Sequence, residues 1–383
     1  MLLKAMIALL RFSSSRKEKK ELPLSEVKSI LIAELTRLGD VVAIIPSLRV
    51  FRSHFPQAQI HVLVSDRFVS LLNTIDLDIQ VHGVPEHFIA KGFAAGVYIA
   101  RSIRPDLACS MSPARRNATV TLASGARFKV GYLTYLDSLT PYLSMTPVEG
   151  FGVTLDTNSH YKRENIGKRP LKICHALGVQ VAGMINGIAW RNEVIEAVGA
   201  RLRSNGVIPS CKYVVIHPFS GWEYRTWSME RFNILARLVV TKLGHDVVFL
   251  CAHEEIHLLD SSRRQFRDQE HVHFFASRDI LESAVALHGG SLFVGNDSGP
   301  LHLAASLGVP VIGLFGPAPP ELTAPRRENG VSLYKRVECS PCDQRKCIRP
   351  QDPCMGLISS GEVFSAVAKS LFATRSELAV ANV

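Results

Sequence analysis

The sequence lacks any stretch long enough to cross a membrane. Its first apolar segment, Met1–Leu10, is interrupted by Lys4 and is much shorter than the roughly 20 apolar residues that a spanning helix needs. No small-residue cleavage site follows, so the sequence does not predict a secretory signal. A solvated tail and an anchor on an anionic membrane surface are equally compatible with this segment and the basic cluster behind it. That cluster comprises Arg11, Arg16, Lys17, Lys19 and Lys20.

Acidic residues are in the minority. The 383 residues include 44 lysines and arginines against 34 aspartates and glutamates, which gives a formal net charge of +10. Such a charge suits nucleic acid, an anionic membrane surface or a phosphorylated substrate, and it also occurs in proteins with none of these partners. The sequence contains no basic run interleaved with aromatic residues and no recognisable motif of a known nucleic-acid-binding module. We therefore expect no nucleic-acid partner.

Cysteine is sparse, with eight residues in the chain. Without an export signal, the expectation is that the thiols are reduced. Four thiols close together near the end of the sequence could hold zinc tetrahedrally. Their spacing is not that of a standard finger or ribbon, so bare thiols or a disulfide are alternatives. The late group is Cys339, Cys342, Cys347 and Cys354, and the scattered cysteines are Cys109, Cys174, Cys211 and Cys251.

Composition and length indicate two folded domains. Hydrophobic residues make up 47% of the chain, which is typical of a globular protein. A chain of 383 residues is longer than a domain with a single hydrophobic core usually is. Strand–helix–strand patterns begin near residue 29 and again near residue 212, and each predicts a parallel α/β sheet. We expect two Rossmann-like, doubly wound domains facing a central cleft. The predicted segments are a tail at 1–27, an N-terminal domain at 28–190, and a C-terminal domain at 191–383 that ends in a helix.

Hydrophobic periodicity places the individual elements. We expect Pro46 to kink or restart the helix that follows the first strand. Residues 133–170 are polar and aperiodic, which predicts an irregular segment. Strands are predicted at 29–35, 59–65, 106–111, 129–132, from 212, at 246–252, from 291 and at 309–316. Helices are predicted after the first strand, at 117–124, 171–177, 192–204 and 229–244, from 301 and from 359.

The turn after the first strand carries an aspartate, Asp40. Ligands of open parallel sheets bind where strands end and helices begin, so this turn is a candidate site. Taken locally, Asp40 is a favoured helix N-cap, and that is the more ordinary interpretation. Facing a cleft, the same carboxylate would remove a proton from a hydroxyl nucleophile.

A second turn, at 296–302, leaves an apolar strand and enters a helix. The helix N-terminus offers free N–H donors and partial positive charge, which suit a pyrophosphate. A capped helix with a buried histidine is the alternative, but this combination of side chains favours a ligand site. The candidate residues are Asp297, Ser298, Gly299 and His302.

Two further strand ends supply donor-site candidates. Ser220 offers a hydroxyl and Arg225 a guanidinium fork for phosphate oxygens. Glu254 follows the next strand and could accept hydrogen bonds from a ribose or a base. On its own, an exposed helix start with acidic residues is the simpler explanation of Glu254.

Three segments together resemble the family 9 glycosyltransferases, which include the heptosyltransferases of lipopolysaccharide core synthesis. They are LGDVVAIIPSLRVFRSHFPQAQIHVLV, HPFSGWEYRTWSMERF and VGNDSGPLHLAASLGVPVIGLFGP, and the late CSPCDQRKC segment is similar to the end of many such chains. The resemblance covers residues 28–370 and lies in the family's order.

The resemblance implies a GT-B fold and an inverting transfer from ADP-heptose to a lipid-A-linked core, with no cofactor or metal required. It implies Asp40 as the base and a location at the cytoplasmic face of the inner membrane. Arg225 stands where some members have lysine, Ser298 where some have threonine, and Gly221 where some have a hydroxyl residue. The implied donor-binding residues are Ser220, Arg225, Glu254, Asp297, Ser298, Gly299 and His302. Candidates for acceptor phosphates are Arg37, Arg115, Arg116, Arg127 and Lys162, although a solvated surface charge is the more ordinary explanation of each one taken individually.

Three alternatives stay open. The enzyme could use another sugar nucleotide or another acceptor. A sugar-nucleotide epimerase of the same fold class would need further acid–base residues, which the sequence does not reveal. A non-catalytic protein with a GT-B shell is disfavoured because Asp40 and the set from Asp297 to His302 are present.

Overall fold

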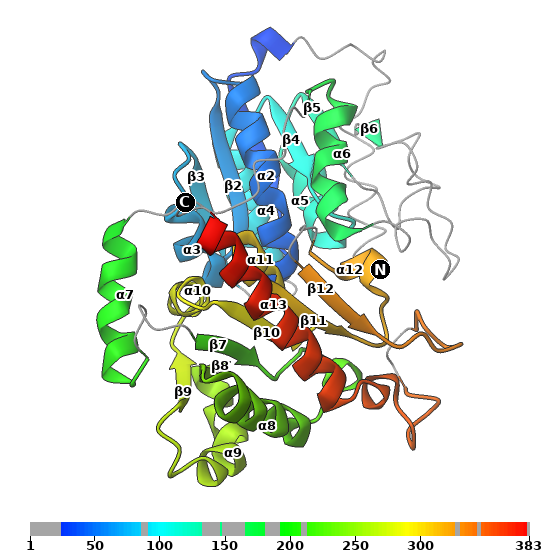
Figure 1. Ribbon diagram of the computed structural model, residues 1–383. Coiled ribbons are helices and arrows are strands. Elements are labelled where there is room, and N and C mark those ends of the chain that lie inside the picture. Colours follow the sequence, from blue (N-terminus) through cyan, green and yellow to red (C-terminus); the bar gives the residue numbers. More distant parts are fainter. Residues whose placement is uncertain are drawn as a thin grey trace. The chain divides into compact units, whose positions relative to one another are not determined.

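The chain contains two α/β units, each built on its own parallel sheet. The computed structural model describes residues 24–85, 91–131, 146–147, 165–180, 192–207, 213–325, 330–342 and 346–380. Unit 1 comprises Met1–Asn73 and Leu77–Ile185, and unit 2 comprises Thr74–Asp76 and Asn186–Val383. Each unit has a six-stranded sheet (Figure 1), which confirms the predicted pair of doubly wound halves. The boundary at residue 190 stays a prediction.

The sheet of unit 1 has the strand order β3-β2-β1-β4-β5-β6. Strand β1 lies at its centre and is buried because its apolar side chains face covered surfaces on both sides. The strands are β1 (Ser29–Ala33), β2 (Gln59–Ser65), β3 (Gln80–Val84), β4 (Leu107–Ser110), β5 (Phe128–Gly131) and β6 (Thr146–Pro147). The principal helices are α2 (Leu38–His54), α4 (Lys91–Ile103), α5 (Arg115–Ala123) and α6 (Arg169–Ala176), and a short helix, α3, spans Val69–Asn73.

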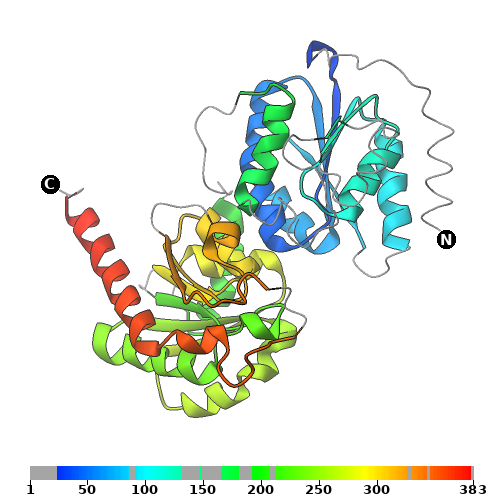
Figure 2. The same cartoon turned by 90° about the vertical axis from the view of Figure 1, so that its right-hand side faces the viewer.

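Helix α2 runs unbroken through Pro46. The predicted restart at this proline is therefore wrong. A proline inside a helix removes one backbone hydrogen bond, but Ile44, Ile45 and Leu48 are buried around it, and their packing holds the helix together. Helix α6 lies alongside α2 (Figure 2) and covers part of its surface.

The sheet of unit 2 has the strand order β12-β11-β10-β7-β8-β9. Its central strands β7 and β10 are fully buried and hydrogen-bond to each other in parallel. The strands are β7 (Tyr213–His217), β8 (Asp246–Ala252), β9 (Val272–Ser277), β10 (Leu292–Asn296), β11 (Val311–Phe315) and β12 (Gly330–Tyr334). The helices are α7 (Asn192–Ser204), α8 (Met229–Leu238), α9 (Asp260–Gln265), α10 (Ile280–His288), α11 (Gly299–Ser306), α12 (Pro320–Thr323) and α13 (Ser360–Val380).

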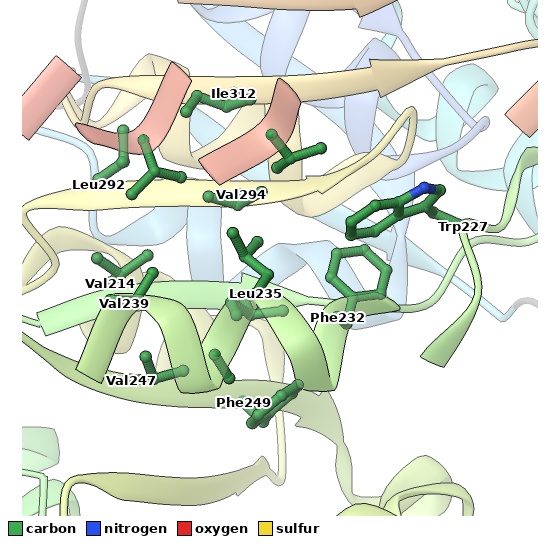
Figure 3. Close-up of a cluster of buried hydrophobic side chains, with 14 of the residues drawn as sticks. Val214, Trp227, Phe232, Leu235, Val239, Val247, Phe249, Leu292, Val294 and Ile312 are labelled. Atoms are coloured by element: carbon green, nitrogen blue, oxygen red, sulfur yellow. The ribbon is translucent and has the colours of Figure 1, made fainter. Parts of the chain in front are cut away.

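A large apolar cluster fills unit 2 between the sheet and helices α8 and α13. Trp227 and Phe232 meet edge to face, with ring centroids 4.8 Å apart (Figure 3). The indole N–H of Trp227 donates a 2.8 Å hydrogen bond to the carbonyl of Ile358, so this buried polar group is satisfied. Trp227 directly precedes Ser228, the N-cap of α8, and the core therefore anchors the end of the turn that leaves β7.

The predicted helix at 229–244 is confirmed in its extent. It begins after the N-cap Ser228 and continues beyond α8 as a π-helical turn, Val239–Leu243. Gly244 ends it with φ = 64°, a left-handed conformation that glycine adopts without strain.

Several elements were not predicted from the sequence. They include β3, β9, α10 and β12. The exposed or half-buried residues of β3 and β12 weaken the hydrophobic pattern there. Within the ranges given above, no helix is long and apolar enough to cross a membrane.

Candidate active site

The order of the strands singles out one place in each sheet. In unit 1 the chain moves outward from β1 through β2 to β3, and then returns to β4 on the other side of β1. Unit 2 repeats this pattern with β7 and β10. Ligands of open α/β sheets bind at such switch points, beyond the carboxyl ends of the two diverging strands. The turns after β1, β4, β7 and β10 are therefore the places to look for a site.

Asp40 lies in the first turn of α2, directly after β1. The N-cap of this helix is Arg37, so the N-cap interpretation of Asp40 is wrong. The half-buried Asp40 carboxylate is favoured here because the N-terminal end of a helix carries partial positive charge. Its partial exposure leaves the carboxylate accessible to solvent.

Glu34, which the sequence analysis passed over, lies at the end of β1 with its side chain fully buried. Its Oε1 atom accepts hydrogen bonds from the Thr36 hydroxyl and, at 3.1 Å, from the Asn117 amide. Burial, and after it the negative charge of Asp40, raises the pKa of Glu34 to about 7, although the side-chain donors oppose this. The available signal in the sequence was a single charged residue inside the apolar run 29–35.

The predicted acceptor arginines fall in different places. Arg37 is exposed at the start of α2, and Arg115 and Arg116 begin α5 after β4, so all three follow strands of the switch point. Arg127 lies at the amino end of β5, opposite the carboxyl ends of the strands, where it pairs with Glu26 at 3.0 Å. The structure thus does not bring Arg127 together with Asp40. Lys162 lies outside the described residues.

The turn after β10 carries four of the donor candidates. Asp297 is 5% exposed, and Ser298 is the N-cap of α11, in which Pro300 occupies the first turn. The hydroxyl of Ser298 makes no capping bond and is buried, and no partner for it lies among the described residues. A buried hydroxyl without a partner beside free helix N–H groups suits an anionic ligand. Gly299 and His302 follow in the first turn of the same helix.

The turn after β7 is joined to the turn after β10. Arg225 forms an ion pair with Asp297 at 3.2 Å, and Thr323 donates a 3.2 Å hydrogen bond to the same carboxylate oxygen. Asn296, which is fully buried, accepts from the Trp227 backbone N–H at 2.9 Å and donates to the Pro218 carbonyl at 2.7 Å. The structure therefore brings Arg225 and Asp297 together. Asn296 and Thr323 could not be predicted as parts of the site, because a contact between distant turns leaves no local signal in the sequence.

Ser220 also lies in the turn after β7. Its hydroxyl donates to the Trp222 carbonyl at 2.6 Å and lies 3.2 Å from the Thr226 hydroxyl. These bonds hold the loop that leads to Arg225. At the end of β7, burial lowers the pKa of His217 to about 4, so this ring is neutral at physiological pH.

The remaining candidate residues are Glu254 and the late cysteines. Glu254 is exposed in the 3-10 helix His253–Leu259, which follows β8, the neighbour of β7. Cys339, Cys342, Cys347 and Cys354 are free thiols. Burial and the charges of the other three thiols raise the pKa of Cys354. In the part of the chain that the structure describes, no three side chains are arranged to hold a metal ion, and the zinc site stays a prediction.

Solved structures share this architecture. A family 9 glycosyltransferase from Veillonella parvula matches with a TM-score of 0.77 at 21% identity, over 93% of this chain and 100% of that one. The ADP-heptose lipopolysaccharide heptosyltransferase II of Escherichia coli matches with a TM-score of 0.69 at 15% identity, over 91% and 99%. The fold is that of a GT-B glycosyltransferase.

Sequence comparison places the chain within that class. The family model described as glycosyltransferase family 9 (heptosyltransferase) matches residues 193–351. Lipopolysaccharide heptosyltransferase 1 of Pseudomonas aeruginosa is 24% identical over 343 residues, which cover 83% of this chain and 87% of that protein. Lipopolysaccharide heptosyltransferase 3 of E. coli is 20% identical over 307 residues, or 77% and 85%. Over residues 193–351 the chain is therefore similar to glycosyltransferase family 9, and these two relatives, which match over most of its length, are heptosyltransferases.

Proposed function

We propose that this enzyme transfers a heptose from ADP-heptose to the lipid-A-linked inner core of lipopolysaccharide, with inversion and without a metal. The observation that carries the proposal is the pair of turns after β7 and β10. There the Arg225–Asp297 ion pair lies beside the Ser298 hydroxyl, which has no partner among the described residues. The names of the curated relatives, which are lipopolysaccharide heptosyltransferases, support the sugar and the acceptor. The name of one structural relative supports ADP-heptose as the donor.

In this proposal unit 2 binds the donor. The N-terminus of α11 and the Ser298 hydroxyl hold one end of the diphosphate, and Arg225 and His302 contribute positive charge. Asp297 orients Arg225, because a buried carboxylate fixes the guanidinium fork to which it is paired. Gly299 permits close approach of the backbone, Ser220 supports the loop, and Glu254 accepts hydrogen bonds from the ribose. The leaving diphosphate gains negative charge, and these groups stabilise it in place of a metal ion.

Unit 1 supplies the base and the acceptor site. The acceptor hydroxyl is a weak nucleophile until Asp40 removes its proton. Its oxygen then attacks the anomeric carbon, and the bond from that carbon to the diphosphate breaks, so that the configuration inverts. Arg37, Arg115 and Arg116 are the cations that unit 1 places after β1 and β4, and we assign them to acceptor phosphates. The contribution of Lys162 to the same site stays a prediction.

The proposed domains follow from this division. Residues 28–190 bind the acceptor and residues 191–383 bind the nucleotide sugar. The basic tail at 1–27 brings the enzyme to the anionic inner face of the cytoplasmic membrane, where its lipid-linked acceptor is made.

The test is an incubation of the purified chain with ADP-heptose and truncated lipopolysaccharide cores, with products identified by mass. UDP-glucose and GDP-mannose serve as matched donors. We expect one heptose to be added, and only from ADP-heptose. Transfer from another donor alone would replace the heptosyl assignment, and binding of ADP-heptose without transfer to any core would contradict the proposed reaction.

A further inference from the structure

Glu34 is an unusual residue to find at the end of a central strand. Its side chain is fully buried, and its backbone N–H donates a 2.9 Å hydrogen bond to the Leu63 carbonyl of β2. Only one carboxyl oxygen, Oε1, is hydrogen-bonded; the buried Oε2 atom has no partner within the described ranges. Burial of a carboxyl group that has one oxygen without a hydrogen bond is unfavourable for folding. Stability alone therefore does not explain the residue.

The bonds of Glu34 connect the two turns of the switch point. Asn117, in α5, is fully buried and donates to Glu34 Oε1 at 3.1 Å and to the Ser112 hydroxyl at 3.0 Å. Its own side-chain oxygen accepts a 2.7 Å hydrogen bond from the Leu35 N–H. This network joins the turn after β1, which carries Asp40, to the turn after β4, which carries Arg115 and Arg116.

The charged neighbour that acts on Glu34 is Asp40, which lies on α2. The groups that face Glu34 from its own turn and from the start of α5 are neutral donors: the hydroxyls of Thr36 and Ser112 and the amide of Asn117. Burial and, after it, the negative charge of Asp40 raise the pKa of Glu34 to about 7. Below pH 7 Glu34 is therefore mainly protonated.

We propose that Glu34 is a positioning residue for the catalytic base, which ties the turn that carries Asp40 to the turn that carries the acceptor arginines. The proposal rests on the assignment of Asp40 as the base. In the transfer step Asp40 takes the proton of the acceptor hydroxyl and Glu34 keeps its own proton, so the charge of the pair changes from −1 to zero. Neutral Glu34 spares the site a second negative charge next to the acceptor phosphates.

A kinetic comparison of three variants tests the role. Glu34→Ala leaves Thr36 and Asn117 without their acceptor, so we expect kcat to fall about 10- to 100-fold with little change in the KM for ADP-heptose. Glu34→Gln keeps an oxygen for both donors and is expected to rescue most of the lost kcat at pH 6. Asp106→Asn is the matched control, because Asp106 caps the opposite end of β1 through 2.9 and 3.0 Å bonds from the Lys28 and Ser29 N–H groups. Its kcat should equal that of the wild type.

A second measurement does not depend on activity. Infrared difference spectra should show a protonated carboxyl band that titrates near pH 7 in the wild type and in Asp106→Asn, and that is missing in Glu34→Gln. The pH profile of kcat should lose its inflection near pH 7 in the same variant. If Glu34→Ala does not fold, the Glu34→Gln spectra and profile decide the question.

The outcomes separate this inference from the proposed function. Wild-type transfer by Asp40→Asn would overturn the base assignment, and the role of Glu34 with it. An inactive Asp40→Asn together with a wild-type kcat in Glu34→Ala would overturn the role of Glu34 alone. An unchanged carboxyl band in Glu34→Gln would also overturn it, whatever the transfer rates.

Discussion

Among the residues that the structure describes, each unit of this enzyme buries one glutamate, and the two are held in opposite ways. Glu282, in the first turn of α10, is 4% exposed and pairs with the guanidinium groups of Arg201 and Arg278. Burial alone would raise its pKa, but the hydrogen bonds from Arg278 and the two positive charges outweigh burial and lower it. The described donors to Glu34 are neutral, the Asp40 carboxylate acts on it, and its pKa is raised.

The difference indicates which of the two glutamates serves function and which serves the fold. A buried carboxylate that is paired with arginines joins parts of a fold, here α7, the end of β9 and α10. A buried carboxyl without such compensation weakens the fold, and natural proteins accept this cost mainly at functional sites. Glu34 lies at a switch point, and Glu282 does not.

The largest difference expected between the two glutamates is in how each makes the free energy of unfolding depend on pH. Because the pKa of Glu34 rises from 4.5 in the unfolded chain to about 7 in the fold, its protonated form is favoured by folding. The stability associated with that proton is complete below pH 4.5 and is lost as the pH rises through 7. Over this range Glu34→Gln should gain up to about 3 kcal/mol relative to the wild type. Urea unfolding at pH 4.5, 6 and 8 measures this, and an offset that does not vary with pH would contradict it.

Glu282→Gln should show the reverse pattern. The lowered pKa of Glu282 means that its ionised form stabilises the fold above pH 4.5, and that this stability is lost as the pH falls through the lower, folded value. We expect a loss of about 2 kcal/mol at pH 7 that shrinks toward acidic pH, while kcat per folded molecule stays unchanged. If both variants respond to pH in the same direction, the contrast between the two glutamates fails.

A smaller effect tests the donor side of unit 2. Arg225→Lys keeps the charge but loses the planar fork that faces Asp297. We expect the KM for ADP-heptose to rise about tenfold, which corresponds to roughly 1.4 kcal/mol, with no change in the inflection near pH 7. Arg237→Lys, at an exposed position on α8, is the matched control. A shifted pH profile in Arg225→Lys would show that the two units do not act separately.

The fold was largely predictable because its central strands are continuous apolar runs. Strand β8 spans the predicted residues 246–252, and β1, β7, β10 and β11 lie within their predicted ranges. Such runs carry their signal locally. Strands β3 and β12 were not predicted because these edge strands mix exposed and buried residues. The predicted restart of the helix at Pro46 was wrong because tertiary packing overrides the local preference of proline.

The candidate site was predictable where it depends on turns and not where it depends on contacts between turns. Asp40, Ser298 and Arg225 follow strand ends and are visible in the sequence. The contact from Asn117 to Glu34 joins residues 83 positions apart, and that from Asn296 to Trp227 joins residues 69 apart. The sequence pattern does not show that these residues meet, and their importance appears only once the sheets are assembled.

The central claim is that unit 1 supplies the base and unit 2 handles the charge of the donor. One measurement tests it directly: single-turnover transfer by Asp40→Asn under saturating ADP-heptose, with donor affinity determined by calorimetry on the same preparation. The account predicts wild-type affinity for ADP-heptose and a transfer rate lower by about 10²- to 10⁴-fold. A transfer rate equal to that of the wild type, at equal affinity, would contradict it.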